Sequence, residues 1–319
     1  GKLASLIALV QAGDNEGMRL LRTLVLTDAS KLPPADLANA IRVIGNTKDA
    51  SVLNTIRLML YNEDAGVVDA AIEALGNTGD KRVVKELLPL LDKAELDRAI
   101  TLSRTLTKLG AGQEIRRRYL PQLRLPTPGV REKAALMLAA TGDPSGWPSL
   151  QLMLTKKEAP YYPLVLTVMG SLPSEESTAF VIQALSGNEQ EQIAALQSIN
   201  LLPQQEREKR LTMVLRDKAR PVAVRSTCIA MLVKFHTPGI DNDLRNIASA
   251  LEGEDPALRA QALIALPAYG LLAQPTVREM VRARFDSEDE NIARAARLTL
   301  LNYAIDALKP VAKPKGKTK

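Results

Sequence analysis

The chain has 319 residues, of which 46% are hydrophobic and only 3% aromatic, so it holds ample material for a core built mainly from Leu and Ala. Such residues lose little rotamer freedom in helices, which favours helix–helix packing over sheets. The formal charge is +6, but residues 309–319 contain five lysines and no acids, so the preceding body is nearly neutral. A single cysteine excludes an intrachain disulfide and a multi-cysteine zinc site.

No apolar run approaches the roughly 20 residues that a membrane-spanning helix needs, so we expect no transmembrane segment. The chain begins at Gly1 rather than Met, and a signal peptide could have preceded it. We slightly favour the cytoplasm, and for this reason a periplasmic or secreted location stays open.

An internal repeat runs through the chain. Residues 40–49 match residues 71–80, and related stretches return at 130–143, 224–232, 258–263 and 292–300. Each stretch has a small residue at one position and a large apolar residue four places later, on the same helical face. The small residues are Ala71, Ala134, Cys228, Ala262 and Ala296, and the large ones are Leu75, Leu138, Leu232, Leu266 and Leu300. The pattern predicts stacked helical hairpins.

In chain order, the spacing predicts nine antiparallel helical hairpins and a final helix. Their ranges are 1–28, 33–61, 65–92, 94–124, 127–156, 160–186, 189–217, 220–252 and 255–285, with the last helix at 288–308. We expect Asp49, Asp80 and Asp143 to cap the helix that follows each. We expect the array to form one domain over residues 1–308 with atypical capping hairpins at both ends, followed by a disordered Lys/Pro-rich tail at residues 309–319.

The string from Asp255 to Leu266 resembles the first helix of a HEAT repeat, as does the string that begins at Gly129. The units are shorter than the roughly 40–47 residues of HEAT and armadillo repeats. They resemble the short bacterial HEAT-like repeats, including those of phycobilisome lyase proteins. The resemblance covers residues 33–305 and implies an all-α solenoid, but this scaffold serves many unrelated functions.

The residues that could support catalysis have structural explanations. His236, the single histidine, lies in a predicted turn, and Cys228 aligns with alanines of the other repeats, which indicates a small core residue. Neither a P-loop nor a GxGxxG motif occurs. Carboxylates such as Glu175 and Glu176 fall at helix starts, where they complement the helix dipole. We expect no catalytic residue, no cofactor and no metal.

Two enzyme classes remain as alternatives from the resemblance. A bilin lyase-like activity is one, although no bilin site can be identified. A DNA glycosylase built from HEAT-like repeats is the other, and such enzymes line a cleft with aromatic residues. Trp147 is the only tryptophan here, and we expect it to pack between adjacent hairpins at a helix start.

Basic residues gather on the predicted second helices, which we expect to line the concave surface of the solenoid. The candidate partner-binding residues are Lys81, Arg82, Lys85, Arg116, Arg117, Arg207, Arg210, Arg278 and Arg282. Such a surface would attract an acidic protein segment or phosphates. The alternative is that these side chains pair with acids four residues away on solvated helix faces.

The sequence thus favours a monomeric, non-catalytic protein–protein interaction scaffold whose partner binds along the concave surface. A nucleic-acid-binding protein that uses the basic helices and tail is the second hypothesis, and it predicts a steep loss of affinity with salt. A lyase-like enzyme is the third.

Overall fold

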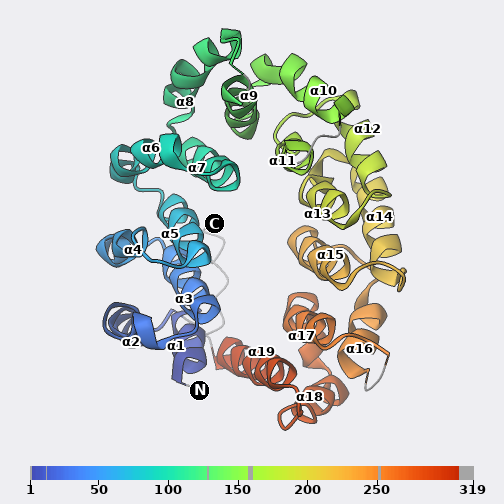
Figure 1. The fold of residues 1–319 in the computed structure, drawn as a ribbon. Helices are drawn as coiled ribbons and strands as arrows, with labels where there is room; N and C mark the ends of the chain where they lie inside the picture. Colours follow the sequence, from blue (N-terminus) through green and yellow to red (C-terminus); the bar gives the residue numbers. More distant parts are fainter. Residues whose placement is uncertain (1, 12, 128, 157–160, 251–252, 309–319) are drawn as a thin grey trace, which may run out of the picture. The chain divides into compact units, whose positions relative to one another are not determined.

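The structure is a computed structural model that describes residues 2–11, 13–127, 129–156, 161–250 and 253–308. Across these residues it contains nineteen α-helices and no strand (Figure 1), which confirms the predicted all-α class. None of these helices is long and apolar enough to cross a membrane. The predicted tail, residues 309–319, lies outside the described residues.

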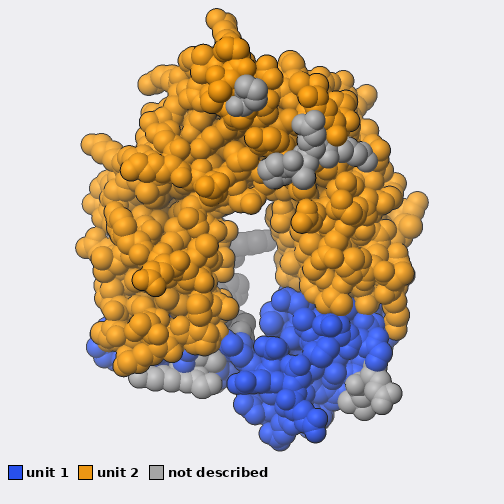
Figure 2. All heavy atoms as spheres, in the orientation of Figure 1, with its two compact units in different colours: residues 1–21, 239–319 blue, residues 22–238 orange. Residues whose placement is uncertain are grey.

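The chain divides into two compact units (Figure 2). Unit 1 contains residues 1–21 and 239–319, and unit 2 contains residues 22–238. The boundary after Leu21 falls inside helix α2 (Asn15–Thr27). The prediction of one domain over residues 1–308 stays a prediction.

Unit 2 alternates first and second helices of hairpins. Its first helices are α3 (Pro34–Asn46), α5 (Ala65–Thr78), α7 (Leu96–Lys108), α9 (Val130–Ala140), α11 (Tyr161–Met169), α13 (Glu189–Gln197) and α15 (Val222–Phe235). Its second helices after α2 are α4 (Leu53–Met59), α6 (Val84–Lys93), α8 (Gly112–Tyr119), α10 (Trp147–Lys156), α12 (Glu175–Ala184) and α14 (Gln204–Arg216). These bounds fall inside the hairpin ranges that the repeat predicts, except that α6 ends at Lys93, one residue beyond the predicted range 65–92.

The predicted repeat positions form the core. The small residues Ala71, Ala134 and Cys228 are fully buried, and so are Leu75 and Leu138 one helical turn later. Burial of one apolar stripe per helix is the main driving force for stacking such hairpins. Each hairpin therefore depends on the hairpins before and after it to cover its apolar face.

The turn inside the hairpin repeats the same two polar contacts. The hydroxyls of Thr47, Thr78 and Thr141 each donate to the carbonyl three residues earlier at 2.7 Å, which closes the first helix. The carboxylates of Asp49, Asp80 and Asp143 accept the backbone N–H two residues later, at 2.8–2.9 Å. These aspartates cap short 3₁₀ turns that lead directly into α4, α6 and α10, one turn earlier than we expected.

Consecutive first helices of unit 2 pack directly against one another, from α3 on α5 to α13 on α15, whereas consecutive second helices approach less closely. Gly45 permits the tightest approach, because an added Cβ would lie 2.6 Å from Ala74 Cα. A stack bends toward its closely spaced side, so the first helices form the inner side of this unit (Figure 1). The prediction that second helices line the concave surface is therefore wrong for unit 2.

Helix α9 is surrounded on all sides. Its residues from Ala134 to Ala140 are buried, and Arg104 of α7 reaches across it to donate to the carbonyl of Thr167 in α11 at 2.7 Å. Burial lowers the pKa of this guanidinium. Arg104 therefore ties together two helices that are not neighbours along the chain.

Unit 1 contains α1 (Lys2–Gln11), α16 (Asp241–Ser249), α17 (Pro256–Ala265), α18 (Pro275–Arg282) and α19 (Glu290–Leu308). Helix α19 packs on α17, α18 and α1. Leu6, Ile7 and Val10 of α1 are buried, so the first helix contributes a full apolar face to the core of this unit.

Candidate binding surface

The residues considered for catalysis have structural roles. Cys228 is fully buried in α15 and its Sγ lies 3.1 Å from the carbonyl oxygen of Leu211. Burial raises the pKa of its thiol to about 12, so it is not a nucleophile at neutral pH. His236 ends α15 with a φ of 47°, which places it at the left-handed C-cap position. Within the described residues, no group of three or more His, Cys, Asp or Glu side chains could hold a metal ion.

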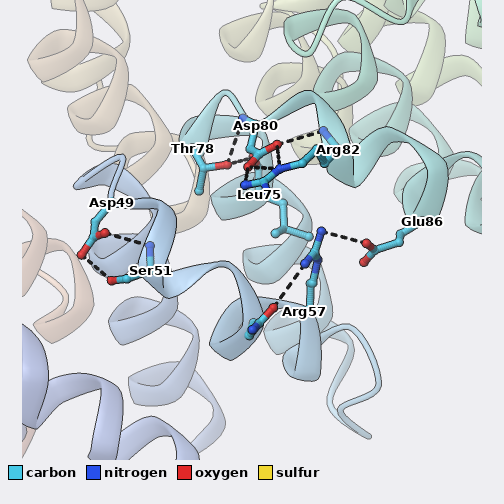
Figure 3. Close-up of polar contacts among 9 residues, drawn as sticks. Asp49, Ser51, Arg57, Leu75, Thr78, Asp80, Arg82 and Glu86 are labelled. Carbon is cyan, nitrogen blue, oxygen red and sulfur yellow. Dashed lines mark hydrogen bonds and ion pairs between the residues drawn. The ribbon is translucent and has the colours of Figure 1, made fainter.

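Two of the nine predicted basic contact residues take part in the turns between helices. Arg82 lies beside Asp80, the capping carboxylate, with an ion pair at 2.5 Å (Figure 3). The hydrogen bonds from Arg82 hold the pKa of Asp80 at about 2. Arg116 of α8 binds Asp143 in the turn of the next hairpin. Burial raises the pKa of Asp143, but bonds from Ser145 and Arg116 outweigh this effect and leave it lowered.

Four more of the nine residues contact other groups of the protein. In unit 2, Arg210 pairs with Glu206 at 2.6 Å, and Arg207 lies 4.3 Å over the ring of Phe235. In unit 1, Arg282 pairs with Glu279 at 2.9 Å, and Arg278 donates to the carbonyl of Leu272 at 2.7 Å. Ion pairs between residues three or four apart on one helix are the alternative to partner binding that the sequence left open.

Lys81, Lys85 and Arg117 are the remaining three, and each is exposed on the described surface of unit 2. An added Cβ on Gly110 would lie 3.7 Å from Lys81 Nζ, so this ammonium group sits beside the turn of the next hairpin. These three cations are the part of the predicted set that stays available to an acidic segment.

Other arginines link successive hairpins, which the sequence reasoning missed. On the second helices, Arg57 pairs with Glu86 at 2.9 Å (Figure 3) and Arg118 with Asp92 at 2.7 Å. On the first helices, Arg42 pairs with Glu73 at 2.9 Å and Arg98 with Asp69 at 2.7 Å. In each pair the partners lie about one repeat apart along the chain. Opposite charges about one repeat apart in the sequence would have predicted these ion pairs.

Two hollows flank the hairpin turn at residues 141–145 in unit 2. The turn hollow has a volume of about 480 Å³ and lies between that turn and the α7–α8 turn, with Gly110, Gln113 and Arg116 in its wall. The tryptophan hollow has a volume of about 420 Å³ and lies on the other side, toward the start of α12. Gly142 and Pro144 line both, so the two hollows adjoin.

Trp147 is positioned by the turn that precedes it. Asp143 caps the 3₁₀ turn of residues 144–146, and Gly146 is buried so closely on α9 that an added Cβ would lie 2.7 Å from Ala135 Cα. Trp147 therefore starts α10 from a fixed point and is half-buried. It lines the tryptophan hollow together with Pro144, Leu172 and Pro173.

The polar wall of the tryptophan hollow comes from α12. Ser174 caps this helix by accepting the backbone N–H of Ser177 at 3.0 Å. Glu176 follows in the first turn, is exposed and lines the hollow. Trp147 thus lies between hairpins, as we expected, and it also lines an apolar surface depression that includes the Glu176 carboxylate.

Comparison with known proteins identifies the repeats. Residues 29–106 match the family described as HEAT repeats. No curated protein matches the chain. The solved structure of human deoxyhypusine hydroxylase in complex with glycerol is similar at 16% identity and a TM-score of 0.43, covering 95% of this chain and 99% of that one. An engineered protein is similar at 16% identity and a TM-score of 0.35, with the same coverage. Residues 29–106 thus match HEAT repeats, and the described residues outside this range continue the all-α hairpin architecture.

Proposed function

We propose that the chain is a non-catalytic protein-binding module whose partner lies across the turn hollow and the tryptophan hollow of unit 2. HEAT repeats commonly mediate protein interactions, which supports this class of function. The observation that carries the proposal is the adjacency of the two hollows, which share Gly142 and Pro144 and include the only tryptophan of the chain.

The chemistry of the two hollows suits a protein segment. Tryptophan is among the residues that contribute most to protein–protein binding, because it buries a large rigid surface at low entropic cost. Here it lies among prolines and a leucine that need no reorganisation to receive an apolar side chain. The wall of the turn hollow offers the exposed amide of Gln113 for hydrogen bonds. An apolar anchor with a polar rim is the usual anatomy of such an interface.

The charge beside the turn hollow supports part of the sequence hypothesis. Lys81 lies next to Gly110 of this hollow, so an acidic residue of the partner would meet it there. Arg116 lies in the same wall, but Asp143 already balances its charge. We retain Lys85 and Arg117 as further contacts for the same acidic stretch.

The test is capture of a partner by the tagged full-length chain from extracts of the cells that make it. Trp147→Ala should reduce recovery of a specific protein by about tenfold or more. Leu152→Ala is the matched control, because Leu152 lies on the same helix and is 44% exposed but does not line the hollow. Equal thermal unfolding of the two variants excludes a folding defect. Undiminished recovery with Trp147→Ala would contradict the proposed surface.

The charge is tested in the same assay. Lys81→Glu should weaken capture, and raising the salt concentration should weaken it in the wild type. Lys93→Glu makes the same change of charge at the other end of α6 and should leave capture unaltered. A bound nucleic acid in place of a protein, with an affinity that falls steeply with salt, would favour the second hypothesis instead.

A further inference from the structure

We infer that the tryptophan hollow accepts an extended partner segment in which a proline stands next to a lysine or arginine. The inference rests on the proposed function and specifies the chemistry of the segment that enters this hollow.

The apolar wall is suited to proline. Pro144 and Pro173 are exposed and Trp147 is half-buried, so three rigid rings line the depression together with the buried Leu172. A segment in the polyproline II conformation has few conformations to lose and presents its rings and side chains in a fixed spacing. Grooves that combine aromatic and apolar side chains recognise such segments in several unrelated domains. The preformed wall therefore favours a proline-containing chain over a helix that must fold on binding.

The opposite wall favours a cation. Glu176 lines the hollow and Glu175 precedes it along the chain; both are exposed, and neither forms an ion pair within the described residues. Their position in the first turn of α12 complements the helix dipole. Capping does not require them, because Ser174 already accepts the N–H of Ser177. The Glu176 carboxylate, which lines an apolar depression, therefore attracts a lysine or arginine beside the inserted proline.

The indole adds to this preference. A cation within about 6 Å of a tryptophan ring is attracted to its face, and the attraction grows as the pair is removed from water. A lysine or arginine between Trp147 and Glu176 would meet both groups. An acidic side chain at the same place would be repelled by the Glu176 carboxylate, and a neutral one would gain nothing from it. The hollow therefore selects against acidic proline-rich segments.

Trp147 is also the reporter for the test, because the chain contains one tryptophan. The probe is a capped peptide of repeating Lys-Pro, about eight residues long, which spans roughly 25 Å in polyproline II. It is titrated into the full-length protein while the tryptophan emission is recorded. Peptides of repeating Lys-Ala and Glu-Pro of equal length serve as comparisons. We expect a saturable change with Lys-Pro and an affinity at least about tenfold lower for each comparison peptide.

Variants of the protein locate the contact. Glu176→Gln should weaken Lys-Pro binding about three- to tenfold and reduce its salt dependence. Glu189→Gln is the matched control, because Glu189 is an exposed first-turn carboxylate of α13 outside the hollow. Equal binding of Lys-Ala or Glu-Pro, or equal effects of the two variants, would overturn the inference. If Trp147→Ala still abolishes capture of a protein partner while Lys-Pro does not bind, only the partner chemistry falls. If both experiments fail, the proposed function falls with it.

Discussion

The tight contact between α3 and α5 makes Gly45→Ala a sharp test of the packing. In an isolated helix, replacing glycine with alanine stabilises by roughly 0.5–1 kcal/mol, because glycine loses more backbone freedom on folding. At this position the new methyl group would lie 2.6 Å from Ala74 Cα, and that backbone atom cannot move aside as the end of a flexible side chain can. Overpacking of a core costs about 1–3 kcal/mol. The steric cost outweighs the gain.

We therefore expect Gly45→Ala to destabilise the protein by about 1–2 kcal/mol, which corresponds to a fall in melting temperature of roughly 2–8 °C. Circular dichroism during thermal and urea unfolding measures this change. Gly112→Ala is the matched control, because its Cβ would meet nothing closer than 3.8 Å at the start of α8, and it should be neutral or slightly stabilising. A Gly45→Ala protein as stable as the control would refute the close approach of these two helices.

Three further predictions concern buried and charged groups. The Cys228 thiol, whose pKa burial raises to about 12, should not react with a thiol reagent at neutral pH until the protein unfolds, and full reaction of the native protein would contradict its burial. The pKa of Asp80 is about 2 in the folded protein and 3.8 ordinarily, so the carboxylate stabilises the fold above pH 3.8 and this effect is lost as the pH falls toward 2. Asp80→Asn should therefore reduce the loss of stability to urea over this acid range. An unchanged pH profile would count against the Arg82 contact. Arg104→Ala should lower the free energy of unfolding in urea by about 1–2 kcal/mol, because it removes a charged hydrogen bond across α9. Arg42→Ala breaks an exposed ion pair and should lower it by less than about 1 kcal/mol. The reverse order would contradict the bridging role of Arg104.

The repeat in the sequence was sufficient to predict the helices, because each hairpin carries its own local signals. A small residue such as Ala71 and a large one such as Leu75 lie on one face, and both are fully buried. Thr78 and Asp80 then close one helix and start the next turn through contacts within a few residues. The match to HEAT repeats over residues 29–106 confirms the family resemblance. The finer resemblance to phycobilisome lyase repeats stays a prediction.

The binding residues were harder to predict, because the partner of an arginine depends on the stacking of hairpins. Arg210 and Glu206 follow the expected four-residue rule, but Arg116 finds Asp143 in the next hairpin. A sequence separation of about one repeat becomes a short distance only after the hairpins stack. The tryptophan hollow has the same origin, since Trp147 and Pro173 come from consecutive hairpins. No local pattern predicts such a depression.

The wrong prediction that second helices line the concave surface affects the functional hypothesis, because the direction of bending decides which helices lie on the inner side. The small residues of the repeat lie on the first helices, and Gly45 and Gly76 allow these helices to approach more closely than the second helices do. Bending toward the closer side follows from geometry, so this pattern already argued for first helices on the inner side of unit 2. The basic second helices then lie on the outer side, where Arg57 and Arg118 pair with acids of the adjacent hairpin. A partner search guided by positive charge alone would target side chains that hold hairpins together. The turns between the two helices of a hairpin lie between both sides, and there a partner can contact Trp147 and Lys81 without breaking an ion pair between hairpins.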